Sequence, residues 1–154
     1  LGEHRLHTQW LPFDMATRIP LLAWGSRFAA GTDSRLVSNA DIAPTIAALA
    51  GTEMPAADGI SLLDKQRHAY VPLLCAPDSG MPSEGVGLRS AELMYFEYKT
   101  GEREYYDLRN DPLELNNLLS PGGPAEVYPV GLPGSPWLRA TTAAKLACKR
   151  ETCR

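Results

Sequence analysis

Four polar side chains near the start of the sequence are the first candidates for chemistry. Glu3, His4, Arg5 and His7 bring two imidazoles, a carboxylate and a guanidinium together within a stretch of five residues. Imidazole and carboxylate groups bind metal ions, and imidazole beside a cation contacts anions. Solvated loops often have the same composition. The spacing alone therefore leaves a metal site, an anion site and a plain surface loop open.

No complete catalytic signature occurs elsewhere in the sequence. There is no Gly-x-Ser-x-Gly nucleophile elbow, no His-Glu-x-x-His zinc pair and no Gly-rich phosphate loop. A hydrolytic site needs a nucleophile, a base or metal that activates it, and donors for the developing negative charge. These residues by themselves do not predict a self-sufficient enzyme.

Two of the three cysteines lie at the end of the sequence. Four residues separate Cys148 from Cys153, a spacing that can close a small disulfide loop and would indicate an oxidising compartment. The alternative is two unrelated thiols on a frayed terminus. A zinc site would need a second pair of ligands, and no further Cys or His lies near. Cys75, inside an apolar run, is predicted to be a buried structural thiol.

Composition limits the partners of the protein. Of its 154 residues, 44% are hydrophobic and 21% are charged, which is typical of a globular domain and excludes a disordered tail or a coiled coil. A net charge of −3 provides no basic field for a nucleic acid or an anionic membrane. The longest apolar run, 19–24, is far shorter than the about 20 residues of a membrane-spanning helix. We expect no nucleic acid and no membrane as partner.

The first half of the sequence has the pattern of an α/β unit. Residues 18–25 form a continuous apolar run that ends in glycine, typical of a strand buried on both faces of a largely parallel sheet. A helix capped by Asn39 or Asp41 is predicted to extend to a stop at Gly51. The apolar run 69–75 predicts a second strand of the same kind.

The second half changes to an antiparallel pattern. A Gly/Pro/Ser-rich loop is expected over 76–87. The aromatic-rich runs 93–98 and 103–108 predict a β-hairpin with Gly101 in its turn. Such a pair favours an antiparallel sheet.

Three further elements are expected towards the end of the chain. Residues 111–118 begin with Asp-Pro-Leu-Glu, a pattern that predicts a short helix, which Asn116 and Asn117 would terminate. The segment 120–136 is rich in Pro and Gly and is expected to be an extended surface linker. A last helix is predicted over 137–148, capped by a Ser-Pro pair.

Several blocks of the sequence resemble, in order and spacing, the later part of the sulfatase family. These blocks are Leu1–His4, Phe13–Leu22, Leu36–Thr45, Asp58–Leu63 and Tyr95–Leu119. The opening block is most similar to iduronate sulfatase, and the tail with its paired cysteines is similar to glucosamine sulfatases. Because several independent blocks occur in the right order, the resemblance is specific.

The resemblance implies an α/β fold with an alkaline-phosphatase-like core. Residues 1–75 would supply late strands and a helix of that core, and residues 76–119 would form a small α+β C-terminal subdomain with an antiparallel hairpin. A Pro/Gly-rich linker at 120–136 and a C-terminal helix with the Cys-x4-Cys tail at 137–154 would follow. In this family a calcium ion and a formylglycine made from Cys or Ser hydrolyse a sulfate ester.

The resemblance also assigns roles to single residues. The family nucleophile lies in a Cys/Ser-x-Pro-x-Arg motif, which this sequence lacks. The calcium ligands would fall just upstream of Leu1, so no metal ligand is assigned and a missing N-terminal half is expected. The catalytic Lys that contacts the sulfate aligns with Gln9, a neutral and weaker donor. His4 is implied to line the substrate pocket.

We therefore expect a fragment of a sulfuric ester hydrolase, inactive alone, whose parent acts on a sulfated carbohydrate or another sulfate ester. An extracellular, periplasmic or lysosomal location follows from the same resemblance. Two alternatives stay open: a fragment of a phosphonate or phosphodiester hydrolase of the same superfamily, and a truncated, non-catalytic binding or structural product.

Overall fold

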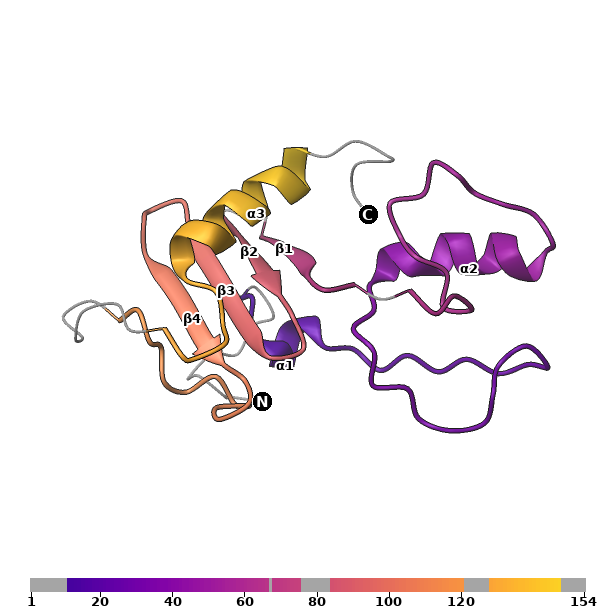
Figure 1. Ribbon diagram of the computed structural model, residues 1–154, viewed down its shortest axis with the longest axis horizontal. Helices are drawn as coiled ribbons and strands as arrows, with labels where there is room; N and C mark the ends of the chain where they lie inside the picture. The colour runs from indigo at the N-terminus through magenta and orange to yellow at the C-terminus, as the bar shows by residue number, and fades with distance from the viewer. Residues whose placement is uncertain (1–10, 67, 76–83, 121–127, 148–154) are drawn as a thin grey trace.

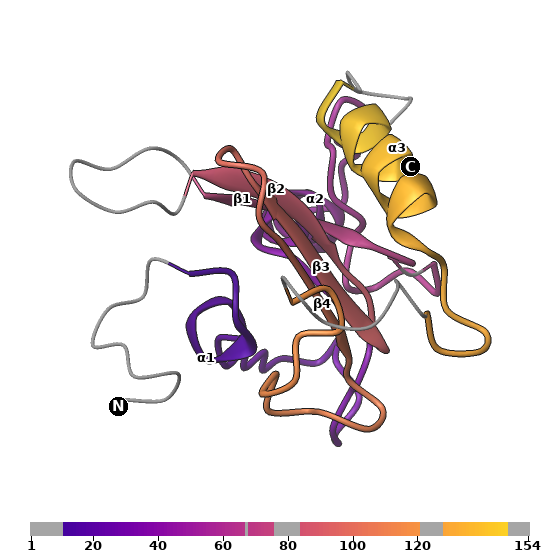
Figure 2. The same ribbon diagram turned by 90° about the vertical axis from the view of Figure 1, so that its left-hand side faces the viewer.

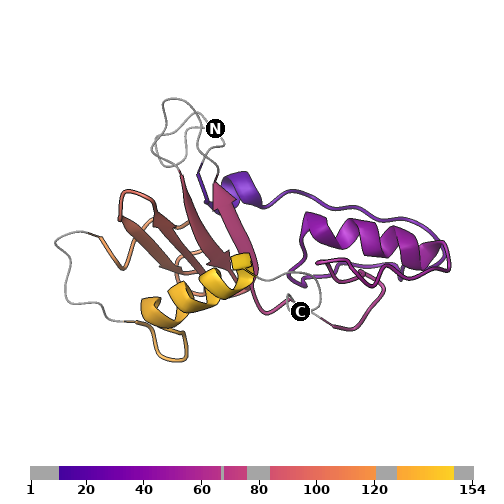
Figure 3. The same cartoon turned by 90° about the horizontal axis from the view of Figure 1, so that it is seen from above.

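The structure is a computed structural model that describes residues 11–66, 68–75, 84–120 and 128–147 (Figure 1). It has two parts that lie side by side. One is an antiparallel sheet with a helix across it, and the other contains a short helix among long irregular segments, as the view from above also shows (Figure 3). Among the described residues, no helix is long and apolar enough to cross a membrane.

Four strands form the sheet, and each pairs with the next one along the chain. Their order is β1 (Val71–Cys75), β2 (Gly85–Arg89), β3 (Leu93–Tyr98) and β4 (Arg103–Asp107). All pairs are antiparallel, and in this register Tyr95 of β3 lies opposite Leu88 of β2 and Tyr105 of β4. The predicted hairpin is confirmed as β3 and β4, with Gly101 in its turn at a φ of 101°.

The sheet lies between two helices. Helix α3 (Ser135–Ala147) crosses one face, and the single turn α1 (Asp14–Thr17) lies on the opposite side (Figure 2). The predicted C-terminal helix is thus confirmed. Alternate side chains of a strand point to opposite faces, so each face has its own apolar cluster.

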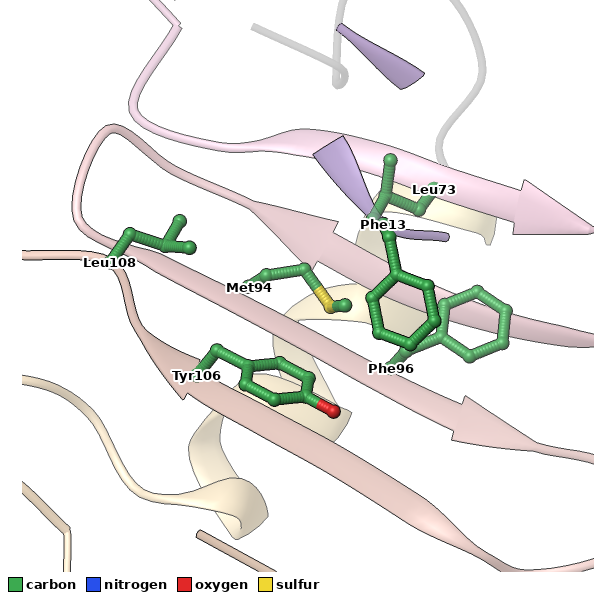
Figure 4. Packing of buried hydrophobic residues seen from close by; sticks show 6 residues of the cluster. All are labelled: Phe13, Leu73, Met94, Phe96, Tyr106 and Leu108. Atoms are coloured by element: carbon green, nitrogen blue, oxygen red, sulfur yellow. The ribbon is translucent and has the colours of Figure 1, made fainter. Parts of the chain in front are cut away.

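Two apolar clusters hold these layers together. On the α1 side the buried side chains are Phe13, Leu73, Met94, Phe96, Tyr106 and Leu108 (Figure 4). On the α3 side they are Leu88, Leu93, Tyr95, Tyr105 and Leu138. The expected α/β class, with an antiparallel hairpin in its second half, is therefore confirmed.

The helix predicted to end near Gly51 is confirmed. It consists of the 3-10 turn η2 (Asn39–Asp41) followed by α2 (Ile42–Leu49), and Gly51 has a φ of 76° at its end. The cap is Ser38 and neither of the two expected residues, because the Ser38 hydroxyl accepts from the Ala40 N–H while Asp41 accepts from the Ser38 N–H. This reciprocal pair is a capping box.

The strand predicted over 18–25 is wrong for this structure. The segment is irregular, and Leu22 and Trp24 are 95% and 99% exposed. A strand buried on both faces needs strands beside it and helices above and below it, and no described segment supplies them. The 69–75 strand exists as β1 but is only half-buried: Leu73 is buried while Pro72 and Leu74 are exposed.

Two expectations for the second half also need correction. The loop expected over 76–87 does not reach residue 87, because β2 begins at Gly85, and residues 76–83 lie outside the described parts of the chain. The short helix expected over 111–118 does not form: Glu114 has a φ of 57°, and the Asp111 carboxylate accepts from the N–H groups of Leu115 and Asn116. A left-handed residue ends any helix, so Asp111 stabilises a turn instead.

The segment expected to be a linker is partly packed. In its described portion, Tyr128 and Leu132 contact the α3-side cluster, and the Tyr128 ring lies 5.4 Å from that of Tyr105. Cys75 is half-buried beside the α1-side cluster, so the thiol predicted to be buried is covered only in part. Burial raises the pKa of its thiol.

Candidate functional site

The residues predicted to do chemistry lie outside the described parts of the chain. This holds for His4 and Gln9 and for the proposed disulfide partners Cys148 and Cys153. The description resumes at Leu11, only two positions after Gln9. The contacts of the segment that begins at Leu11 therefore show how the chain next to the candidate pocket is held.

Residues 11–14 are anchored on the sheet face opposite α3. Phe13 is 5% exposed, and its ring meets that of Tyr106 edge-on at 6.0 Å between centroids (Figure 4). Pro12 is fully buried, and Leu11 packs against the same cluster. The Phe13 carbonyl accepts from the N–H groups of Ala16 and Thr17 in α1. The segment thus ends in a fixed hydrophobic anchor.

A two-point ion pair strengthens this anchor. Arg89, at the end of β2, donates from Nε to Asp14 Oδ1 at 2.7 Å and from Nη2 to Asp14 Oδ2 at 2.8 Å. The two side chains are only 16% and 18% exposed. Partial burial and the paired geometry make such a contact stronger and more directional than a surface ion pair.

Glu114 holds the backbone of the same residue. Its Oε2 accepts from the Asp14 N–H at 2.7 Å, and the side chain is almost completely buried. Burial raises the pKa of Glu114 to about 7; the Asp14 N–H lowers it, the Asp14 carboxylate raises it, and Arg89 and Glu104 make smaller opposing contributions. Glu114 Oε1 and Arg89 Nη1 are buried without a hydrogen-bond partner among the described residues.

Tyrosines border this charged group. Tyr98 donates its hydroxyl to Glu104 Oε1 at 3.0 Å. Burial raises the pKa of Tyr98 and of Tyr106, so both phenols keep their protons at ordinary pH. Glu114 and Tyr106 are buried and Tyr98 is half-buried, so the arrangement can position the chain above it.

A second polar cluster joins α2 to the block 58–63. Buried Asp41 accepts from the Ile60 N–H at 2.8 Å and lies 2.8 Å from His68 Nε2. Thr45 donates to the Asp41 carbonyl and accepts from the Leu62 N–H. Asp41 therefore has a structural role that differs from the helix cap expected for it, and no sequence pattern pointed to His68, which lies in an irregular stretch.

The described residues do not fit a calcium site. They include no group of three or more His, Cys, Asp or Glu side chains that could hold a metal ion. The nearest arrangement, Asp14 with Glu114, is already occupied by the Arg89 guanidinium and a backbone N–H. Calcium prefers six to eight oxygen ligands, so neither carboxylate belongs to such a centre.

A hollow of about 270 Å³ lies between β2, β3 and α3. Its polar groups are paired with one another: Tyr95 donates to Glu97, and Arg139 donates to both oxygens of that carboxylate. These bonds occupy the Tyr95 hydroxyl, both Glu97 oxygens, and Nε and Nη2 of Arg139.

Residues 2–128 match a family model described as N-sulphoglucosamine sulphohydrolase, C-terminal. Choline-sulfatase of Rhizobium meliloti (strain 1021) is 32% identical over 135 residues, which cover 82% of this chain and 26% of that protein. N-acetylglucosamine-6-O-sulfatase of Bacteroides thetaiotaomicron is 30% identical over 135 residues, which cover 77% of this chain and 24% of that protein. The chain thus spans about a quarter of the length of these curated relatives.

Solved structures also resemble the chain. One is BT4656 in complex with its substrate D-glucosamine-2-N,6-O-disulfate, with a TM-score of 0.46 and 25% identity. Another is BT1596, a 2-O GAG sulfatase, with a TM-score of 0.46 and 32% identity. Each match covers 51% of this chain and 19% of the other.

Proposed function

Because the chain belongs to the N-sulphoglucosamine sulphohydrolase C-terminal family, we propose that it is the C-terminal part of a sulfuric ester hydrolase. The observation that carries this proposal is the family match over residues 2–128, which two sulfatase relatives support. One of these relatives is named for a sulfated amino sugar, and a sulfated carbohydrate is therefore the substrate class we propose for the complete protein.

The role proposed for the sheet is to support a substrate pocket. His4 is proposed to line that pocket, and Gln9 is proposed to stand where relatives have a sulfate-contacting lysine. Phe13 and Asp14, just after these residues, are held on the sheet by packing and by charged hydrogen bonds. A pocket works best when its residues are held by a rigid element, so the anchor would restrict movement of the residues before it.

The partner proposed for the other part of the chain is the rest of the sulfatase core. Large apolar side chains stand exposed there, among them Leu22 and Trp24 on the irregular segment and Ile46 on α2. Extensive exposed apolar surface marks an interface. The matched relatives are more than three times as long as this chain, so enough additional core exists in such proteins to cover it.

The chain alone is proposed to be inactive. Its sequence contains no Cys/Ser-x-Pro-x-Arg motif, and its described residues hold no calcium site. The nucleophile and the metal would come from the additional core. A disulfide between Cys148 and Cys153 and an extracellular, periplasmic or lysosomal location belong to the same proposal, since small disulfide loops persist in oxidising compartments.

The test compares the 154-residue chain with the complete reading frame that encodes it. Both are incubated with calcium and with 4-nitrophenyl sulfate, 4-nitrophenyl phosphate or a phosphonate monoester. We expect sulfate release from the complete protein and none from the chain. Turnover by the chain above a heat-killed control would overturn the proposal, and preference of the complete protein for the phosphonate ester would favour the other hydrolase class.

A further inference from the structure

Three charged side chains from distant segments meet beneath α1. Asp14 comes from α1, Arg89 from the end of β2, and Glu114 from the turn after β4. We propose that Arg89 and Glu114 form a proton-controlled clamp, which holds Asp14 and the segment before it on the sheet while Glu114 is protonated and weakens when Glu114 ionises. The clamp itself does not depend on the proposed function. Only the statement that the clamped segment forms a wall of the substrate pocket rests on that function.

The clamp holds both the side chain and the backbone of one residue. Arg89 binds the two carboxylate oxygens of Asp14 at 2.7 and 2.8 Å, and Glu114 Oε2 accepts the Asp14 N–H at 2.7 Å. The adjoining Phe13 ring is buried against the sheet. Movement of residues 11–14 away from the sheet must therefore break all of these contacts together.

The conformation of Glu114 is costly, which argues against a merely incidental contact. Its φ of 57° lies in the left-handed region that non-glycine residues rarely adopt, and its side chain is only 2% exposed. Its Oε1 has no hydrogen-bond partner among the described residues. Strained and incompletely satisfied polar residues are typical of positions selected for more than stability.

The surroundings of Glu114 oppose its ionisation. In the described part of the chain, the groups that face Glu114 are the Asp14 carboxylate from α1, Glu104 and Tyr106 from β4, and Arg89 from β2, which is the one cation among these groups. Arg89 already binds both oxygens of Asp14, so it compensates only part of a second negative charge. Burial of the carboxyl is the largest part of the penalty.

The direction of the pH effect follows from these facts. The pKa of docked Glu114 is about 7, and release into water would return it to the usual 4.5. Below the lower value both states carry the proton and docking is strongest. Between the two pKa values only the released state ionises, so docking weakens as pH rises. Above the pKa of the docked state, docking stays at its weakest and no longer depends on pH.

Hydrogen exchange of the intact 154-residue chain, read by mass spectrometry, tests the clamp. Protection factors, which remove the intrinsic pH dependence of exchange, are compared at pH 5 and pH 8 for peptides covering residues 11–17. We expect protection to fall by nearly two orders of magnitude, roughly 70-fold, at pH 8, because each unit of the shift from 4.5 to about 7 changes the docking equilibrium about tenfold across the pH range that lies between the two values. In Glu114→Gln, which keeps an accepting oxygen without a charge, we expect no such fall.

Peptides covering β3 serve as the folding control, with unchanged protection in both proteins. Equal protection at both pH values in the original chain, or the same fall in Glu114→Gln, would overturn the clamp. If Glu114→Gln loses β3 protection, the carboxyl carbon shift of Glu114 in the isotope-labelled original chain decides: titration near pH 7 supports the proposal, and titration near 4.5 contradicts it.

The same variant separates this proposal from the proposed function. In the complete protein, we expect KM for the sulfate ester to rise above pH 7 and Glu114→Gln to remove that rise. A pH-dependent anchor in a protein without sulfatase activity would refute the function and leave the clamp standing. Sulfatase activity together with a pH-independent anchor would refute the clamp and leave the proposed function standing.

Discussion

Asn117 pairs with the backbone of Tyr105 along the outer edge of β4. Its Oδ1 accepts from the Tyr105 N–H at 3.1 Å, and its Nδ2 donates to the Arg103 carbonyl at 2.9 Å. The Leu118 N–H adds a bond to the Tyr105 carbonyl at 3.0 Å. An amide side chain thus occupies the place of a further strand and covers an edge that would otherwise be open to association.

Asn117→Ala should weaken the sheet at this edge. It removes the partner of the Tyr105 N–H and the Arg103 carbonyl, and leaving such groups unpaired costs about 1 to 3 kcal/mol of unfolding free energy. Urea unfolding followed by circular dichroism measures the loss. Asn116→Ala, at an exposed neighbour, is the matched control. Equal midpoints for the two variants would contradict the assigned role of Asn117.

Gly87→Ala should destabilise the α1 side of the sheet. A Cβ at this position would lie 2.1 Å from the Tyr95 carbonyl oxygen and 2.7 Å from the Phe96 ring. Overpacking of this kind costs about 1 to 3 kcal/mol. Val86→Ala, a half-buried neighbour on the other face, should cost less. A melting temperature of Gly87→Ala at or above that of Val86→Ala would disprove the close contact.

Much of the sheet was predictable because its signals are local. The hairpin of β3 and β4 has aromatic strands and Gly101 at a position that needs a positive φ. β2 escaped prediction because its glycines, which make room for the Phe96 ring, resemble loop residues. The error over 18–25 has a different origin: a continuous apolar run signals burial without naming the partner that buries it.

The charged anchor could not be predicted from one sequence. Asp14 is 75 residues from Arg89 and 100 residues from Glu114, and no local pattern connects residues at such separations. The Asp-Pro-Leu-Glu pattern predicted that Glu114 is the third residue of a helix, whereas Glu114 lies in a turn and accepts the Asp14 N–H. Gln9, in contrast, was found through resemblance alone, whereas His4 was found first in the polar cluster near the start of the sequence; the roles of both stay predictions.

Acid should remove a stabilising contribution of Asp107. Hydrogen bonding from the Arg109 side chain lowers the pKa of this carboxyl to about 2, with further bonds from Asn110 and the Arg109 N–H, against an opposing effect of burial. A lowered folded pKa gives stability that is present above the usual 3.8 and is lost as pH falls towards 2. Arg109 is partly exposed, so solvent screening limits the contribution to about 1 kcal/mol.

Asp107→Asn measures that contribution. The variant should be less stable than the original chain at pH 7, and the difference should shrink between pH 4 and pH 2.5 in urea unfolding. A difference that stays constant over this range would show that the stabilisation does not depend on the charge of Asp107.

Replacing exposed apolar side chains of the irregular segment should reduce self-association. Leu22→Ser and Trp24→Ser remove two of the most exposed apolar groups, and we expect less binding of a hydrophobic dye and a smaller species in light scattering. Val130→Ser is the control, because Val130 is also 95% exposed but lies in a different part of the chain. If all three variants behave alike, the segment is not the interface.

Gln9→Lys tests the assignment of the pocket in the complete protein. If Gln9 stands where relatives have the sulfate-contacting lysine, a lysine there would place a full positive charge against the charge that develops on the sulfate oxygens. Removing one such preorganised donor typically costs about 10² to 10³ in rate, so restoring it should raise kcat by at least about tenfold.

Two further variants accompany Gln9→Lys. His4→Ala should lower kcat/KM, because it removes a residue proposed to line the pocket. Thr8→Lys is the control for an added charge at a neighbouring position. Steady-state hydrolysis of a sulfate ester with calcium present measures all three. An unchanged rate in Gln9→Lys and in His4→Ala would remove both residues from the pocket, whereas an equal gain in Thr8→Lys would trace the effect to long-range attraction of an anionic substrate.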